Sequence, residues 1–116
     1  MYKKILVLDD REVRHEYFKD YYRYRDIDHV YSATECIFFL ENYSHEYDIV
    51  TLDHDLNGGA YESSDQQNSG YTVAKWLSEN KDKQPETILI HSMNEHGAKK
   101  MMELLPSAKW VPCHVY

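Results

Sequence analysis

The chain has 116 residues, of which 42% are hydrophobic and 28% are charged. This length and balance are typical of one globular domain, so we expect residues 1–116 to form a single domain with one functional site. No stretch approaches the roughly 20 consecutive apolar residues that a membrane span requires. The four apolar residues before Asp9 are too few for the core of a secretory signal. The sequence therefore excludes an integral membrane protein and predicts a cytoplasmic one.

The charge balance argues against non-specific binding to duplex nucleic acid. The chain has 20 acidic and 13 basic residues, a formal net charge of -7 that repels a phosphate backbone. Only residues 11–25 are locally basic, and there arginines alternate with tyrosines. This segment has two interpretations. It is either a surface on which nucleotide bases stack or a helix whose Val13, Tyr17 and Tyr21 form a core-facing stripe.

The first half of the chain predicts two strand and helix pairs and a third strand. Residues 5–8 are continuously apolar, as in a strand that is covered on both faces, and a helical pattern follows over residues 11–24. A short strand is expected at 29–31. Ser32 and Glu35 have the spacing of a helix capping box, and the helix that they begin carries apolar residues to Tyr43. Residues 48–52 repeat the character of the first strand.

The second half continues the same alternation after a long loop. Residues 57–69 have no apolar periodicity, and loops of this length in a compact domain are more often functional than accidental. A helix is expected from Tyr71 to Leu77, and a buried strand at 87–90. Asn94 can cap a further helix that Pro106 terminates, and 110–111 is the last candidate strand. This alternation predicts a doubly wound α/β fold with a parallel sheet between helices.

Chemically capable side chains follow each of the strong strands. They are Asp9 and Asp10, then Asp53, His54 and Asp55, then His91 and Ser92. Ligands of doubly wound sheets bind beyond the carboxyl ends of the strands. If the strand order is 2-1-3-4-5, the first and third strands are neighbours about 5 Å apart, and their carboxylates face one pocket. A divalent cation would relieve the repulsion between them, and oxygen ligands suit magnesium or manganese.

Structural roles compete with these functional ones. One of Asp9 and Asp10 can serve as a helix N-cap. His54 and His91 can each be a hydrogen-bonded structural histidine, and Ser92 alone indicates nothing. The remaining histidines are most simply surface or helix-terminal residues, with His114 left open; they are His15, His29, His45 and His96. Cys36 and Cys113 have no metal-binding spacing and are expected to be buried.

The order of these motifs resembles the receiver domain of two-component response regulators over nearly the whole chain. The similarity implies a flavodoxin-like three-layer sandwich with a five-stranded sheet of order 2-1-3-4-5. It places Asp53 at the phosphoacceptor position, Asp9 and Asp10 at the acidic metal ligands and Ser92 at the switch hydroxyl. By the same similarity, the backbone carbonyl of Asp55 completes a magnesium site.

The sequence also departs from that pattern. Residues 110–114 lack the lysine with which receivers grip the phosphoryl group, and the chain ends at Tyr116 before a fifth helix. Two histidines, His54 and His91, are present instead. Together with Asn94 and the long loop, they resemble a divergent receiver family thought to process cyclic phosphates.

Our leading hypothesis is a metal-dependent phosphoesterase that acts on a cyclic phosphate of a nucleotide or RNA end. The expected catalytic residues are His54 and His91 as an acid and base pair, with Asp53 and Ser92. The expected metal ligands are Asp9, Asp10, Asp53 and Asp55, and the expected substrate-binding residues are Arg11 and Asn94. The alternatives are a signalling receiver phosphorylated at Asp53 and a phosphate-binding module without turnover. The partner is expected to be a small phosphorylated ligand or RNA end, and a homo-oligomer stays open.

Overall fold

The structure, a computed structural model, describes residues 3–115. Its centre is a parallel five-stranded sheet of order β2-β1-β3-β4-β5. The strands are β1 (Lys4–Leu8), β2 (Ile27–Val30), β3 (Tyr47–Leu52), β4 (Thr87–Ile90) and β5 (Lys109–Trp110). The helices are α1 (Glu12–Tyr21), α2 (Ala33–Tyr43), α3 (Gly70–Glu79) and α4 (Glu95–Leu104), with short 3-10 turns η1 (Ser44–Glu46) and η2 (Lys81–Lys83).

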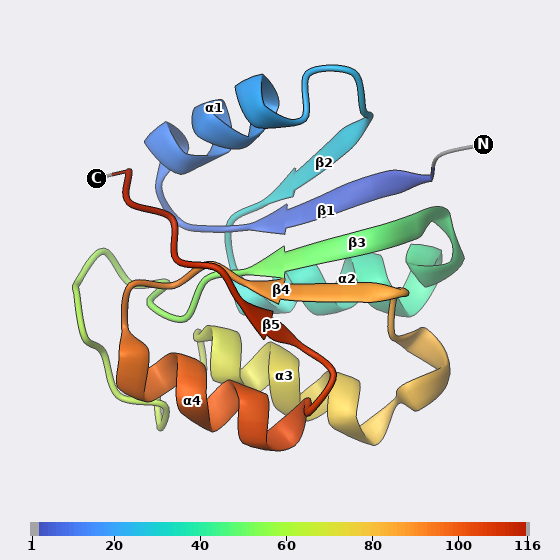
Figure 1. The fold of residues 1–116 in the computed structure, drawn as a ribbon. Coiled ribbons are helices and arrows are strands. Elements are labelled where there is room, and N and C mark those ends of the chain that lie inside the picture. The colour runs from blue at the N-terminus through green and yellow to red at the C-terminus, as the bar shows by residue number, and fades with distance from the viewer. Residues whose placement is uncertain (1–2, 116) are drawn as a thin grey trace.

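The helices divide unequally between the two faces of the sheet. Helix α1 covers one face, while α2, α3 and α4 cover the other (Figure 1). Along β1, Leu6 and Leu8 pack in the larger core under the three helices, whereas Ile5 and Val7 pack in a smaller core with Phe18. This alternation follows from the period of two in a strand. The predicted doubly wound receiver-like fold and its strand order are confirmed, and no helix follows β5 within residues 3–115.

Side-chain caps define the starts of three helices. The Ser32 and Ser69 hydroxyl groups accept hydrogen bonds from Glu35 N and Thr72 N at the starts of α2 and α3. At α4, Asn94 Oδ1 accepts a hydrogen bond from Gly97 N at 2.9 Å. Each bond satisfies an amide that the helix itself leaves without a partner. Helix α1 differs, because its N-cap residue is Arg11 and makes no such bond. Neither Asp9 nor Asp10 is therefore the N-cap.

The prediction that Val13, Tyr17 and Tyr21 form a core-facing stripe on α1 is wrong. Val13, Tyr17 and Tyr21 are 40%, 38% and 65% exposed, and the buried residues of the helix are His15 and Phe18. The prediction that His15 is a surface or helix-terminal residue is also wrong, because His15 lies on the buried face of α1. Its ring is fully buried and bonds both the Asp9 carbonyl and His29 Nδ1. The buried face of α1 is thus rotated away from the tyrosines.

Smaller differences concern the ends of elements. Strand β2 starts two residues before the expected position, strand β5 one residue before it, and α1 ends at Tyr21 rather than at residue 24. Cys36 and Cys113 are both buried, as expected. No helix among residues 3–115 is long and apolar enough to span a bilayer.

Candidate functional site

Three neighbouring strands place one polar residue each at the same level of the sheet. Leu8, Leu52 and Ile90 are paired across β1, β3 and β4. The ladder continues one residue further, because Asp53 N donates to Leu8 O and His91 N donates to Leu52 O. Asp9, Asp53 and His91 are the next residues, and one ligand atom from each lies within 4.8 Å of the others. These three buried side chains are called the carboxylate cluster below.

Arg14 connects the two acids of the carboxylate cluster. Its Nη1 lies 3.3 Å from Asp9 Oδ1 and 3.4 Å from Asp53 Oδ2. Its Nε donates to the carbonyl of Val115 at 3.0 Å, which fixes the guanidinium against the C-terminal segment. Asp9 Oδ1 also accepts a hydrogen bond from Arg11 N. One largely buried cation thus contacts two buried carboxylates.

His91 supports Asp9 from the side of the sheet that α1 covers. Its Nε2 lies 2.8 Å from Asp9 Oδ2, and its Nδ1 lies 2.7 Å from Thr51 Oγ1. An ionised carboxylate can only accept, so Nε2 carries the proton and Nδ1 accepts from the Thr51 hydroxyl. Burial, with a smaller contribution from the charges of Arg14 and His15, lowers the pKa of His91 although Asp9 acts in the opposite direction, and this favours the neutral form. Both ring nitrogens of His91 are therefore engaged within the protein.

The pKa values of the two acids in the carboxylate cluster are shifted in opposite directions. Burial raises the pKa of Asp53 to about 8, with a further contribution from the charge of Asp9 that Arg14 only partly offsets. For Asp9, burial acts in the same direction, but the contacts with His91, Arg11 N and Arg14 outweigh it and lower the pKa. The single positive charge of Arg14 therefore does not compensate both carboxylates, and Asp53 is the acid that keeps its proton to higher pH.

A hollow of about 100 Å³ opens above Asp53. Arg11, Arg14, Asp55, Ser92 and Asn94 contribute to its wall, together with Gly59, Ala60, Tyr61 and Met93. Two arginines and one hydroxyl group thus face the same space as the Asp53 carboxylate. Such donors suit the oxygens of a phosphoryl group.

Two of the expected metal ligands point their carboxylates elsewhere. Asp10 Oδ2 accepts a hydrogen bond from Gly58 N at 2.7 Å. The Asp55 carboxylate accepts hydrogen bonds from the backbone of Tyr61 and Glu62 and from Asn94 Nδ2. Both acids therefore order the loop of residues 57–69 and do not belong to the carboxylate cluster. The Asn94 side chain, expected to bind substrate, is engaged in the same network and in the cap of α4.

The prediction that His54 and His91 face one pocket is wrong. His54 is fully buried, and its ring contacts Asp55 Oδ1 at 2.7 Å and Ser64 Oγ at 2.9 Å. It packs under α4, where a Cβ at Gly97 would lie 2.5 Å from His54 Cδ2. Because successive side chains of a strand point to opposite faces, His54 leaves the sheet on the side opposite to Asp53. His54 therefore joins the long loop to α4.

The carboxylate cluster fits a divalent cation through its two acids. Asp9 and Asp53 offer carboxylate oxygens, which hard cations prefer, and their charge exceeds that of Arg14. His91 Nε2 is already engaged with Asp9, so His91 orients that carboxylate. Asp9 and Asp53 are thus the residues that would hold the ion.

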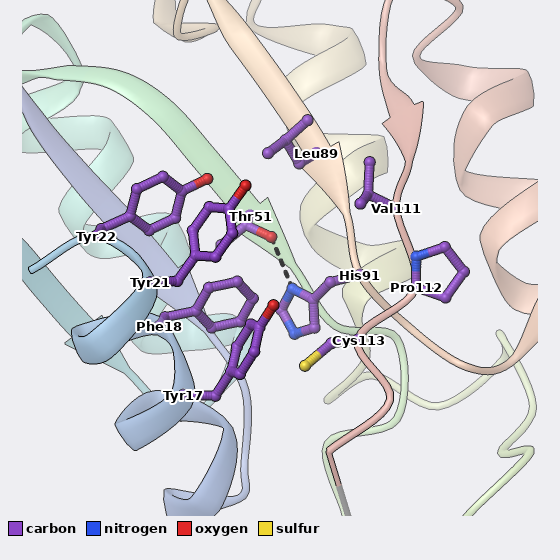
Figure 2. Close-up of a pocket in the computed structure, with 10 residues that line it drawn as sticks. All are labelled: Tyr17, Phe18, Tyr21, Tyr22, Thr51, Leu89, His91, Val111, Pro112 and Cys113. Carbon is purple, nitrogen blue, oxygen red and sulfur yellow. Dashed lines mark hydrogen bonds between the residues drawn. The ribbon is translucent and has the colours of Figure 1, made fainter.

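A second cavity, of about 200 Å³, lies between α1 and the segment that follows β5 (Figure 2). The rings of Tyr17, Phe18, Tyr21 and Tyr22 line one side, and Val111, Pro112 and Cys113 line the other. His91 lies at its base, with its ring 4.9 Å from that of Phe18. Tyr17 and Tyr21 therefore do not form a core-facing stripe. They contribute to the aromatic wall of this cavity.

Sequence reasoning missed Arg14 and Thr51 as site residues. Arg14 lies in the first turn of α1, five residues after Asp9, and only its identity as a cation near two acids signals a role. Thr51 precedes Asp53 by two residues, so it points to the same face of β3. This period of two is a signal that the sequence contains.

Comparison with known proteins shows the family and the fold. The model of the cyclic-phosphate processing receiver domain matches residues 4–107. A search of curated proteins found no match.

Solved receiver domains have the same fold. The phosphorylated cyanobacterial phytochrome response regulator RcpA superposes with a TM-score of 0.76 at 14% identity, covering 98% of this chain and 83% of that one. For the response regulator TrrA from Thermotoga maritima with Mg²⁺-BeF, the values are 0.70, 23%, 96% and 86%. For a chain of the CheX-CheY-BeF3-Mg²⁺ complex from Borrelia burgdorferi, they are 0.75, 18%, 98% and 80%. The family match covers most of the chain, and the protein therefore belongs to the cyclic-phosphate processing receiver domains.

Proposed function

We propose that the protein is a metal-dependent phosphoesterase that hydrolyses a cyclic phosphate of a nucleotide or RNA end. The observation that carries this proposal is the hollow in which the Asp53 carboxylate faces Arg11, Arg14 and Ser92. It joins donors for phosphoryl oxygens to an acid that can hold a proton. The family match supports a cyclic phosphate as the group bound there.

In this proposal, the protein groups divide the work as follows. Arg11 and Arg14 bind the phosphoryl oxygens and neutralise their charge. Ser92 Oγ accepts a hydrogen bond from Asn94 N, so its own proton is available to a phosphoryl oxygen. His91 is a positioning residue that holds Asp9 in place.

Asp53 transfers the proton during hydrolysis. Its carboxylate accepts a proton from the water molecule whose oxygen forms the new bond to phosphorus. The bond from phosphorus to one ribose oxygen breaks, and that oxygen takes the proton, which leaves a phosphomonoester. A divalent cation held by Asp9 and Asp53, for which we propose magnesium or manganese, would supply charge neutralisation and polarise the phosphoryl group.

The test is turnover of a 2′,3′-cyclic nucleotide with magnesium or manganese present. We expect wild-type protein to release a phosphomonoester and Asp53→Asn to be slower by about 10²-fold or more. The matched control is Asp65→Asn, an exposed acid in the long loop, which should keep the wild-type rate. Equal rates in wild type and Asp53→Asn would remove Asp53 from the mechanism.

A second function, a signalling receiver phosphorylated at Asp53, is favoured by Arg14. Residues 110–114 contain no lysine, but the Arg14 guanidinium places a positive charge beside the Asp53 carboxylate that would accept the phosphoryl group. Acetyl phosphate with magnesium distinguishes the two proposals. Stable labelling of wild type that disappears in Asp53→Asn, without turnover of a cyclic phosphate, would favour the receiver. Phosphate binding without labelling or turnover would leave a binding module.

A further inference from the structure

An open groove of about 590 Å³ continues from the hollow above Asp53. Its walls come from the long loop and from the start of α4, which lie beside each other at one end of the sheet (Figure 1). Tyr61, Met93 and Asn94 line both the groove and the hollow. A ligand whose phosphate occupies the hollow can therefore extend into the groove without crossing another element.

Tyr61 is the large aromatic residue at the junction of the two spaces. The residue is 76% exposed, although tyrosine has a large and mostly apolar ring. Its backbone has a φ of 57°, a left-handed conformation that residues with a Cβ rarely adopt. Among residues 3–115, it is the one residue other than glycine with a positive φ.

Several hydrogen bonds hold Tyr61 in this conformation. Tyr61 N donates to Asp55 Oδ2 at 2.8 Å, and Glu62 N donates to Asp55 Oδ1 at 3.2 Å. Asn94 Nδ2 bonds the carbonyl of Glu62, which ties the loop to α4. The Glu62 carboxylate accepts from the backbone of Asn57 and Gly59. These bonds therefore hold the backbone of Tyr61 beside the hollow above Asp53, and its ring is exposed there.

The charges of the groove favour a base over a second phosphate. The carboxylates of Glu62 and Glu95 lie in its wall beside the imidazole of His96. Arginines line the hollow but not the groove. Acidic side chains repel a phosphate, whereas they accept hydrogen bonds from the amino groups of nucleobases. An aromatic ring beside them offers a stacking face that every base can use.

We propose that this groove binds the base of the nucleotide whose cyclic phosphate lies above Asp53, with Tyr61 as the stacking residue. The inference rests on the proposed function and names the substrate class as a nucleotide with its base attached. The aromatic cavity under α1 is the competing place for a base. It shares no lining residue with the hollow above Asp53, whereas the groove shares three.

Calorimetric binding of two probes tests the subsite without requiring turnover. The probes are inorganic phosphate and a nucleoside 3′-monophosphate, each titrated into the full chain with magnesium. We expect wild type to bind the nucleotide more tightly than phosphate by about 5- to 150-fold, the range for stacking one base. Tyr61→Ala should reduce this ratio to near one, while Tyr61→Phe should retain it.

Two further tyrosine variants complete the design. Tyr24→Ala removes an 89% exposed ring in the turn that follows α1 and should leave the ratio unchanged. Tyr21→Ala opens the cavity under α1 and should also leave it unchanged. Loss of the ratio in Tyr21→Ala but not in Tyr61→Ala would overturn the inference, as would equal binding of the two probes by wild type.

Failure of the subsite and failure of the proposed function give different results. A protein that hydrolyses cyclic nucleotides but shows a ratio of one retains the proposed function and loses the subsite. A protein that shows the ratio and its loss in Tyr61→Ala, but no turnover, retains the subsite and loses the enzymatic function. Binding of neither probe would overturn both.

Discussion

The Arg14 guanidinium lies 3.4 Å from Asp53 Oδ2 and simultaneously 3.3 Å from Asp9 Oδ1. Helix α1 thereby supplies the positive charge at the carboxyl ends of β1 and β3. The Arg14 side chain is only 12% exposed, so solvent screens these contacts weakly. The absence of a lysine from residues 110–114 therefore does not leave the site without a cation.

Removing Arg14 is expected to destabilise the protein because it leaves two buried carboxylates without their cation. Arg14→Met should lower the free energy of unfolding by about 2 kcal/mol or more, measured by urea denaturation at pH 7. The matched control is Arg11→Met, which removes an exposed arginine beside the same hollow and should cost little. In an Asp53→Asn background, Arg14→Met should cost markedly less. Equal costs in both backgrounds would show that Arg14 and Asp53 are not coupled.

The raised pKa of Asp53 predicts the sign of a pH dependence. Its ordinary value is 3.8 and its value in the fold is about 8, so between these the folded state holds a proton that the unfolded state has released. Asp53 therefore makes stability fall as pH rises towards about 8, with the effect levelling above that value. The lowered pKa of His91 acts in the opposite direction, but only below its ordinary value of 6.5. Above pH 7 the contribution of His91 is constant. Burial also raises the pKa of the Cys36 and Cys113 thiols, and comparison with Asp53→Asn removes their contribution because both proteins contain them.

Thermal unfolding of Asp53→Asn against wild type measures this effect. Without divalent ions, the melting temperature of the variant should exceed that of wild type by about 4 °C or more at pH 9, the shift that about 1 kcal/mol gives a domain of this size. The difference should shrink as pH falls from 9 to 7. Magnesium or manganese should raise the melting temperature of wild type more than that of the variant. A difference that is constant across this window would contradict the raised pKa.

His54 is expected to act through packing against Gly97. Gly97→Ala places a methyl group 2.5 Å from the His54 ring and should lower the free energy of unfolding by about 1 to 3 kcal/mol. In a His54→Ala background, the same substitution should cost little, because the ring that it meets is gone. Chemical denaturation of the two single variants and the double variant gives this comparison. Additive costs would show that the two residues do not contact each other.

The fold could be predicted from the sequence because its strongest signals are local. The strands at residues 5–8 and 87–90 are apolar on both faces, and Ser32 and Asn94 cap helices where their spacing indicates. The sequence also predicted that acids at the ends of neighbouring strands lie close together, and one carboxylate oxygen each of Asp9 and Asp53 lie within 4.8 Å of each other. Local sequence thus gives the edge of the sheet at which the site forms.

The direction of each side chain at that edge could not be read from adjacency alone. Asp53 and His54 are neighbours in sequence, but they leave β3 on opposite faces, and the same alternation separates Asp9 from Asp10. The buried face of α1 was equally ambiguous. Tyr17 and Tyr21 have helical spacing, but so do Arg14 and Phe18. In the structure it is Phe18 that packs in the smaller core and Arg14 that bonds the carbonyl of Val115.

Hydrolysis of the cyclic phosphate is best followed by phosphorus-31 NMR of one 2′,3′-cyclic nucleotide, recorded over time with magnesium. With wild-type protein, we predict that the cyclic diester signal decays and a phosphomonoester signal replaces it. The rate should fall by about 10²-fold or more with Asp53→Asn and stay unchanged with Asp65→Asn. If the cyclic diester is unchanged in the presence of folded wild-type protein and magnesium, the protein is not a cyclic phosphoesterase for this nucleotide and the proposed function is wrong.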